Sequence, residues 1–275
     1  MKSFTMKALA VAVLGLAGVG SAMAACPTDP FSAWSSDTGG TNNGALLGGT
    51  TTGVTPGLNS TSCAMSAMFT TAPGSNGESA TVYDQSPQLE QTYRFRFYID
   101  PTAISSSLSS VNTVEVFSAQ TTTGHGPNTP ASSKLVRFVL LGTSSASTYK
   151  LRVLAACTAG DAGVTVAAGY CSSKFQTGTT NTGDITLNAG ATRLEGQVTI
   201  GATGSGGVVN IWTGANTGTP DRVLNITNTA WGGSDGVKQA VMGLSSSTVG
   251  FRNAAVNKAV LFDEFDSRRQ TMIGN

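Results

Sequence analysis

Few residues of this chain have the types and spacing that catalysis requires. The best candidate for acid–base chemistry is the run Glu264-Phe265-Asp266, in which two carboxylates would share one face of a strand. Paired carboxylates about 5 Å apart carry out retaining glycoside hydrolysis. The next position on that face is Arg268, and a cation there cannot serve as the proton donor. The run therefore predicts a solvated ionic face, and a glycoside hydrolase would lack a recognisable acid/base pair.

Four other residues are candidates for contact with a ligand. His125 and Asn128 lie in one Gly/Pro-rich loop, and His125 is the single histidine of the chain, so it is either a ligand contact or a plain surface residue. Trp212 and Trp231 could stack on sugar rings, because an aromatic face covers the apolar side of a pyranose. Core packing is the alternative for Trp212, and both possibilities stay open for Trp231.

The four cysteines, Cys26, Cys63, Cys157 and Cys171, favour disulfides over a metal centre. An even number of cysteines in an exported chain is typical of disulfide bonding. Three connectivities are possible, and we expect Cys157–Cys171, at the edges of one loop, together with Cys26–Cys63. A zinc site is disfavoured because the chain has no C-x-x-C pair and only one histidine.

The amino terminus has the pattern of a secretory signal peptide. Lys2 and Lys7 precede an apolar run over residues 8–20, and Ala22-Met23-Ala24 follows as a small-residue cleavage signal. The apolar run is too short for a stable membrane anchor. We expect residues 1–24 to be removed and the protein to be secreted, periplasmic or at the cell surface, without membrane insertion.

Residues 25–60 are rich in Gly, Thr, Asn and Ser and have few large apolar side chains. Such a segment buries little surface, which predicts a loop-rich leader. It is either a flexible linker or an edge strand that packs through Phe31 and Trp34.

The charge of the chain argues against nucleic acid as a partner. The chain has 275 residues, and removing Lys2 and Lys7 from its 16 basic residues leaves 14 against 15 acidic ones. Overall charge would attract neither a nucleic acid nor an anionic membrane to such a protein.

The elements that must position any site are short strands. The segment Tyr93–Asp100 alternates without a break, with Tyr93, Phe95, Phe97 and Ile99 on one side, which predicts a long strand between a core and a wet face. Gly, Ser and Thr clusters separate further runs of this kind, and no stretch shows a convincing helical period. The expected strands are Met65–Thr70, Ala80–Tyr83, Tyr93–Asp100, Val114–Ala119, Leu135–Leu141, Tyr149–Ala155, Arg193–Ile200, Val208–Trp212, Arg222–Thr227, Gln239–Leu244 and Val260–Phe265. The pattern predicts an all-β protein, an antiparallel two-sheet jelly-roll sandwich.

Two passages carry a resemblance to a known group of domains. The segments Asp84–Pro101 and Leu261–Arg269 resemble the opening and closing strands of bacterial concanavalin A-like (laminin-G-like) jelly-roll domains of exported proteins. The resemblance implies one such domain over residues 61–275. It also implies a structural calcium at Asp263, whereas the alternative is an ion pair between Asp263 and a nearby arginine.

These observations favour a secreted, non-catalytic β-sandwich module that binds a polysaccharide or glycan. The exported sandwich pattern, the missing carboxylate pair and the loop tryptophans support it. A self-associating structural protein of the cell surface is the alternative, and a glycoside hydrolase is the third hypothesis.

Overall fold

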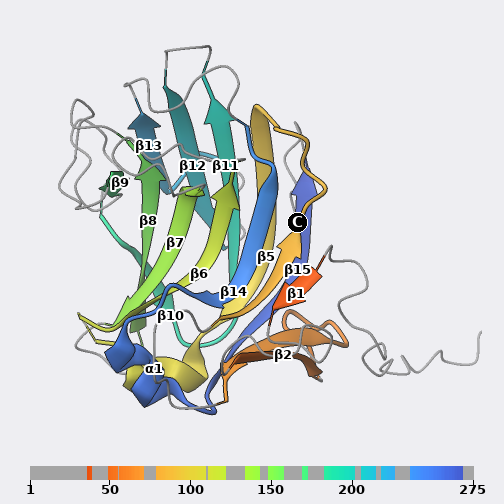
Figure 1. Cartoon of the computed structure of the whole chain (residues 1–275), viewed down its shortest axis with the longest axis vertical. Helices are drawn as coiled ribbons and strands as arrows, with labels where there is room; N and C mark the ends of the chain where they lie inside the picture. The colour runs from red at the N-terminus through yellow and green to blue at the C-terminus, as the bar shows by residue number, and fades with distance from the viewer. Residues whose placement is uncertain are drawn as a thin grey trace, which may run out of the picture.

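The chain folds into two antiparallel β-sheets that stack face to face (Figure 1). The computed structural model describes residues 36–38, 49–54, 56–70, 79–109, 111–121, 134–142, 148–157, 169–172, 183–201, 206–214, 218–226 and 236–268. The architecture confirms the predicted all-β jelly-roll sandwich.

Strands distant in sequence are neighbours in both sheets. In order across the sheet, the first sheet contains β1 (Ser36–Thr38), β4 (Ala80–Asp84), β14 (Gln239–Ser245), β6 (Thr113–Gln120), β7 (Lys134–Gly142), β8 (Thr148–Ala156) and β10 (Ile185–Asn188), and β9 (Tyr170–Ser172) also pairs with β8. The second sheet contains β13 (Arg222–Ile226), β12 (Gly207–Thr213), β11 (Thr192–Ile200), β5 (Thr92–Asp100), β15 (Ala259–Arg268), β3 (Ala64–Phe69) and β2 (Gly49–Val54). The strand predicted from residues 93–100 therefore lies in the middle of the second sheet.

An aromatic core fills the space between the sheets. Tyr93, Phe95, Phe97 and Ile99 of β5 are each at most 2% exposed, while the residues between them are only half-buried. The ring of Phe95 lies 4.2 Å, centroid to centroid, from that of Phe117 on β6 of the first sheet. The alternation read from the sequence therefore assigns each face of β5 correctly, because side chains of a strand point alternately to opposite faces.

Gly196 of β11 lies directly against this core. A Cβ atom at position 196 would stand 2.2 Å from Cζ of Phe95, its partner across the β5–β11 ladder. The ring of Phe95 also contacts Phe117 and Phe138, so it has no free space into which to move. The absence of a side chain at position 196 is what allows the large ring to lie flat on β11.

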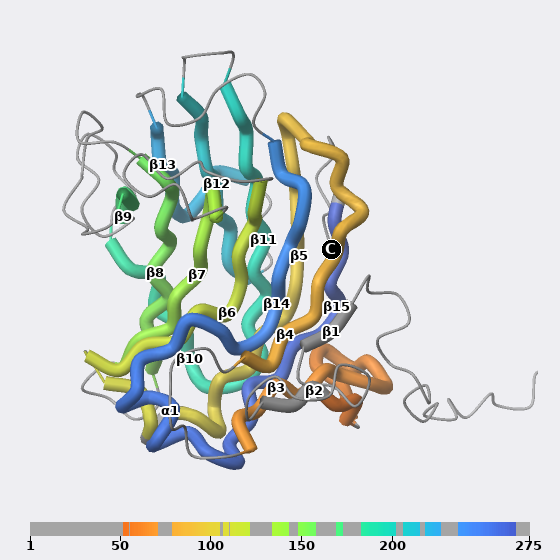
Figure 2. Tube along the Cα trace, viewed as in Figure 1, coloured from red at the N-terminus to blue at the C-terminus, as the bar shows by residue number. Residues whose placement is uncertain are grey.

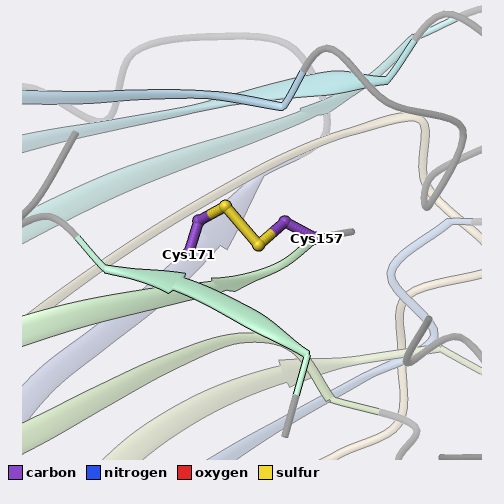
Figure 3. Close-up of a disulfide and its surroundings, with 2 residues drawn as sticks. All are labelled: Cys157 and Cys171. Atoms are coloured by element: carbon purple, nitrogen blue, oxygen red, sulfur yellow. A yellow bond between two sulfur atoms is a disulfide. The ribbon is translucent and has the colours of Figure 1, made fainter. Parts of the chain in front are cut away.

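The Cys157–Cys171 disulfide joins the end of β8 to the short strand β9 (Figure 3). The Cα atoms of the two cysteines are 5.6 Å apart, and the cysteines are 14 positions apart in sequence. This is the pairing expected from the sequence. Cys63 is also disulfide-bonded, but Cys26, its expected partner, lies outside the described residues.

The structure adds elements that the sequence pattern did not predict. Helix α1 (Val249–Ala255) and a 3-10 helix, η1 (Thr102–Ser107), lie at one end of the sandwich (Figure 2). The side chain of Thr248 caps α1 by accepting a hydrogen bond from the amide of Phe251. A helix of seven residues is too short to show a helical period in the sequence, and the prediction of no helix was wrong for this reason.

The predicted leader contributes edge strands. Strand β1 pairs with β4, and β2 pairs with β3, so residues from the 25–60 range lie at an edge of each sheet. Phe31 and Trp34, the expected anchors, lie outside the described residues. In the part of the chain that the structure describes, no helix is both long enough and apolar enough to span a bilayer.

Candidate functional site

The outer face of the second sheet carries a cluster of charged and aromatic side chains. These side chains belong to the positions of β5 and β11 that alternate with the core residues. In the β5–β11 register, Arg193 faces Tyr98 and Glu195 faces Arg96. Directly opposed residues of antiparallel strands have neighbouring side chains, so these four groups form one continuous patch.

The patch continues onto the strands on either side. On β12, Trp212 lies opposite Glu195. On β15, Asp263 lies opposite Tyr98 and Asp266 lies opposite Arg96. The patch thus spans four strands, and its residues come from three distant parts of the chain.

A buried ion pair organises the floor of the patch. One oxygen of Glu195 lies 2.5 Å from Nη2 of Arg193, and the other lies 3.9 Å from Nη1 of Arg94. Glu195 is fully buried and Arg193 is 3% exposed. Arg193 also donates a hydrogen bond to the carbonyl of Gly214. Arg193 and Glu195 alternate with the core residues of β11, yet both are buried on the outer side of the sheet.

Trp212 holds Arg94 at the side of this ion pair. The guanidinium carbon of Arg94 lies 5.6 Å from the centre of the Trp212 ring system, a cation–π contact. The indole nitrogen of Trp212 donates a hydrogen bond to the carbonyl of Gly218. Burial lowers the pKa of Arg94, and the carboxylate of Glu195 acts against this shift. An arginine remains a cation at neutral pH even so.

A pocket of about 680 Å³ opens over this floor. Its size is in the range of small-molecule and sugar subsites. It is lined by Asn59, Arg96, Tyr98, Ala191, Thr192, Arg193, Gly214 and Glu264. Arg96 and Tyr98 are half-buried on the floor, as expected for groups that have fixed positions and still reach a ligand.

A β-bulge in β15 shapes one wall of the pocket. The β5–β15 register shifts between Asp263 and Asp266, and the intervening Glu264 has a φ of 48°. This left-handed conformation is uncommon for a residue other than glycine, asparagine or aspartate. The amide of Glu264 donates a hydrogen bond of 2.8 Å to the carboxylate of Asp263. Bulges of this kind redirect side chains beside functional sites, and here Glu264 is part of the pocket lining.

The same aspartate fixes the loop on this side of the pocket. The second carboxylate oxygen of Asp263 accepts hydrogen bonds from the amide of Leu58, at 2.7 Å, and from the hydroxyl of Thr61. A Cβ atom at Gly57 would lie 2.8 Å from this oxygen, so the loop approaches Asp263 closely. Asn59 lies at the tip of this loop and, like Glu264, lines the pocket.

The pocket therefore combines three kinds of chemistry. The guanidinium groups of Arg96 and Arg193 can attract a carboxylate, and arginine suits planar anions because its donors form a rigid fork. The phenol of Tyr98 can transfer a proton. Asn59 and Glu264 can form hydrogen bonds with hydroxyl groups.

Of the four residues expected to bind a ligand, the structure describes only Trp212. His125, Asn128 and Trp231 lie outside the described residues, and their roles stay predictions. Trp212 is 4% exposed, and it lies on the outer face of the sheet, against Arg94, rather than between the two sheets. In this position it supports the floor of the patch.

The calcium prediction at Asp263 also stays a prediction. Both carboxylate oxygens of Asp263 accept the hydrogen bonds described above, from Leu58, Thr61 and Glu264. Among the residues that the structure describes, no three or more His, Cys, Asp or Glu side chains group together as metal ligands would. The contacts of Asp263 give it a role as an anchor between β15 and the loop at residues 57–61.

The sequence contains a signal for the pocket, although the alternation alone predicts only a wet strand face. Arg94, Arg96 and Tyr98 occupy alternate positions of one strand. Two arginines and a tyrosine on one face of a central strand are costly to desolvate unless they have partners. The partners come from β11, β12 and β15, and their register with β5 is not visible in the sequence.

Neither a protein-family model nor a curated protein sequence matches this chain. Solved structures match it in fold. Endo-beta-1,4-glucuronan lyase from the fungus Trichoderma reesei has a TM-score of 0.55 and 13% identity, over 87% of this chain and 92% of that one. The PL-14 alginate lyase from Aplysia kurodai has a TM-score of 0.51 and 13% identity, over 80% and 87%. Cellulose induced protein, Cip1, has a TM-score of 0.51 and 13% identity, over 88% and 93%.

These comparisons correct the functional prediction. The sequence favoured a non-catalytic binding module, whereas two of the three structures above are named as lyases, one of glucuronan and one of alginate. The chain shares the jelly-roll β-sandwich of these polysaccharide lyases and of Cip1.

Proposed function

We propose that this protein is a polysaccharide lyase that cleaves a uronate-containing polysaccharide by β-elimination. The observation that carries the proposal is the placement of Tyr98 and Arg96 together on the floor of one pocket, with Arg193 beside them. The fold shared with glucuronan and alginate lyases supports it.

The reaction begins at the carbon next to the uronate carboxylate. Removal of its proton is difficult because negative charge accumulates on the carboxylate. Arg96 binds this carboxylate and stabilises the charge as it develops, and Arg193 lies beside it on the next strand with its own charge balanced by Glu195. Fixed charges that meet a developing charge are usually the largest single contribution to an enzyme's rate.

Tyr98 carries the proton in this mechanism. Residues two apart on a strand are about 7 Å apart along the same face, so the phenol of Tyr98 can reach the sugar whose carboxylate is bound at Arg96. As a phenolate, Tyr98 accepts the proton from the carbon, and the phenol so formed gives it to the departing glycosidic oxygen, which regenerates the phenolate. The carbon–hydrogen and glycosidic carbon–oxygen bonds break, a carbon–carbon double bond forms, and no water is consumed.

Glu195 supports this arrangement from beneath the floor, without lining the pocket itself. Nη2 of Arg193 forms an ion pair of 2.5 Å with the carboxylate of Glu195, and Nη1 of Arg193 donates a hydrogen bond to the carbonyl of Gly214. A guanidinium held in this way loses little conformational freedom when a carboxylate binds. Such preorganisation lowers the cost of reaching the transition state.

A cleavage assay tests the proposal. Purified protein is incubated with a panel of uronate polymers, and the ultraviolet absorbance of unsaturated uronate ends is followed. We expect Tyr98→Phe to lower kcat by at least about 100-fold, the usual scale of acid–base catalysis, with an unchanged circular dichroism spectrum. Tyr83→Phe, on β4 of the first sheet, is the matched control and should retain activity. New reducing ends without unsaturation, or full activity in Tyr98→Phe, would refute the proposal.

We also propose that the protein is exported. Cleavage after residue 24 would leave the 25–60 leader and a single domain over residues 61–275, of the concanavalin A-like group. The Cys157–Cys171 disulfide supports an oxidising compartment. Mass spectrometry of the protein recovered from the periplasm or medium tests this, because an intact residue 1 would contradict it.

A further inference from the structure

Glu264 places a carboxylate in a pocket that otherwise contains cations and neutral groups. The bulge in β15 brings it there, and its left-handed backbone is stabilised by the hydrogen bond from its amide to Asp263. Strained residues of this kind persist where the surrounding structure holds them, and they concentrate at functional sites. The fold therefore fixes the backbone that carries this negative charge at the pocket.

The loop with Asn59 and the bulge with Glu264 form one unit. The carboxylate of Asp263 accepts hydrogen bonds from the amide of Leu58 and the hydroxyl of Thr61 on the loop, and from the amide of Glu264 on the bulge. Within the loop, the amide of Gly57 donates to the carbonyl of Thr61 at 3.1 Å. Asn59 and Glu264 thus form a pocket wall of fixed geometry, beside the arginine-bearing floor.

This wall and this floor favour different sugars. A uronate binds at the cationic floor, but a second uronate against the wall would bring its carboxylate close to Glu264. Two like charges a few ångströms apart repel each other, and the repulsion grows as less water separates them. A neutral sugar has no such penalty, and its hydroxyl groups can donate to the Glu264 carboxylate and bond to the Asn59 amide.

The charge around the floor agrees with this selectivity. The positive charge of Arg193 is already opposed by the buried Glu195. The whole chain has 16 basic against 15 acidic residues. A protein that follows a densely charged polyanion gains from a strongly positive surface, and this chain has no such excess.

We propose that the subsite between Asn59 and Glu264 accepts a neutral sugar, so that the substrate is a heteropolysaccharide in which uronates alternate with uncharged residues. The inference rests on the proposed lyase function for its uronate subsite. It departs from the glucuronan and alginate that the structural neighbours are named for.

Binding and cleavage are measured separately to test it. Isothermal titration calorimetry at low salt gives the Kd of Tyr98→Phe protein for oligosaccharides of two kinds, homopolyuronates and alternating uronate–neutral sugar chains. Cleavage of the same polymers by the wild-type protein gives kcat/KM. Glu264→Gln is made in both backgrounds, because it removes the charge and keeps an oxygen acceptor. Glu90→Gln, just before the other end of β5, removes the same charge away from the pocket as the control.

We expect the alternating chains to bind at least about tenfold more tightly than the homopolyuronates, which corresponds to 1.4 kcal/mol of discrimination. Glu264→Gln should remove most of that difference by improving binding of homopolyuronates, and Glu90→Gln should leave it unchanged. Equal Kd values for the two kinds of chain, or a preference that Glu264→Gln does not alter, would overturn the inference.

The two proposals fail in different ways. Selective binding of alternating chains without unsaturated products would support the neutral subsite and refute the lyase. Unsaturated products from homopolyuronates at rates equal to those from alternating chains, unchanged in Glu264→Gln, would support the lyase and refute the neutral subsite.

Discussion

Replacement of Glu195 by alanine should destabilise the protein more than replacement of any more exposed ion-pair partner. Glu195 has no exposed side-chain area, and its partners Arg193 and Arg94 are 3% and 13% exposed. Glu195→Ala would leave two guanidinium groups largely out of water beside a missing carboxylate. Removing one member of a buried ion pair typically costs about 3 to 5 kcal/mol.

A more exposed ion pair on the first sheet provides the comparison for this loss of stability. Arg152 and Asp184 form two hydrogen bonds of 2.9 and 2.8 Å, and their side chains are 27% and 11% exposed. Asp184→Ala should cost only about 1 kcal/mol, because water can solvate the remaining arginine. For a chain of this size, 3 to 5 kcal/mol corresponds to a fall in Tm of about 6 to 20 °C.

Urea unfolding and differential scanning calorimetry of the two variants provide the measurement. A third variant, Arg193→Met with Glu195→Leu, removes the ion pair without leaving an unpaired charge between these two positions, and it should recover much of the lost stability. The reasoning is refuted if Glu195→Ala costs no more than Asp184→Ala, or if the double variant is no more stable than Glu195→Ala.

Three further predictions concern the core and the first sheet. Gly196→Ala should lower the free energy of unfolding by about 1 to 3 kcal/mol through overpacking against Phe95. In a protein that already carries Phe95→Leu, Gly196→Ala should cost less, because the smaller side chain leaves room for the added methyl group. Equal costs of Gly196→Ala in the two proteins would contradict this reasoning. Burial acts to raise the pKa of Glu115, but Lys134 and Arg137 outweigh it, so that the pKa is lowered overall. The ionised Glu115 therefore contributes its full share to the free energy of unfolding above the unfolded pKa of about 4.3, and this share is lost as the pH falls through the folded pKa. Acid unfolding of Glu115→Gln should therefore show a shallower pH slope than the wild type, and equal slopes would count against the ion cluster. Replacing both Cys157 and Cys171 by serine should cost about 3 kcal/mol in chemical unfolding, as expected for a loop of about 15 residues; unchanged stability would show that the disulfide adds little.

Local patterns were sufficient to predict the sandwich. The alternation of Tyr93, Phe95, Phe97 and Ile99 assigns the core face of β5, because a period of two residues can bury only one side of a strand. The spacing of the cysteines around one loop indicated the Cys157–Cys171 disulfide. Both inferences depend on residues that are near one another in the chain.

The pocket depends on contacts between residues that are far apart in the chain. Tyr98 meets Arg193 and Asp263 only because β5 pairs with β11 on one side and with β15 on the other. From the sequence, Glu264 is predicted to lie on an exposed ionic strand. Its place in the pocket lining depends on a bulge, which arises where the register of β15 against β5 shifts. The sequence by itself determined which side chains leave the core, because that follows from alternation along each strand. Only the tertiary structure decided which of them meet, because strand order and register set the neighbours across a sheet.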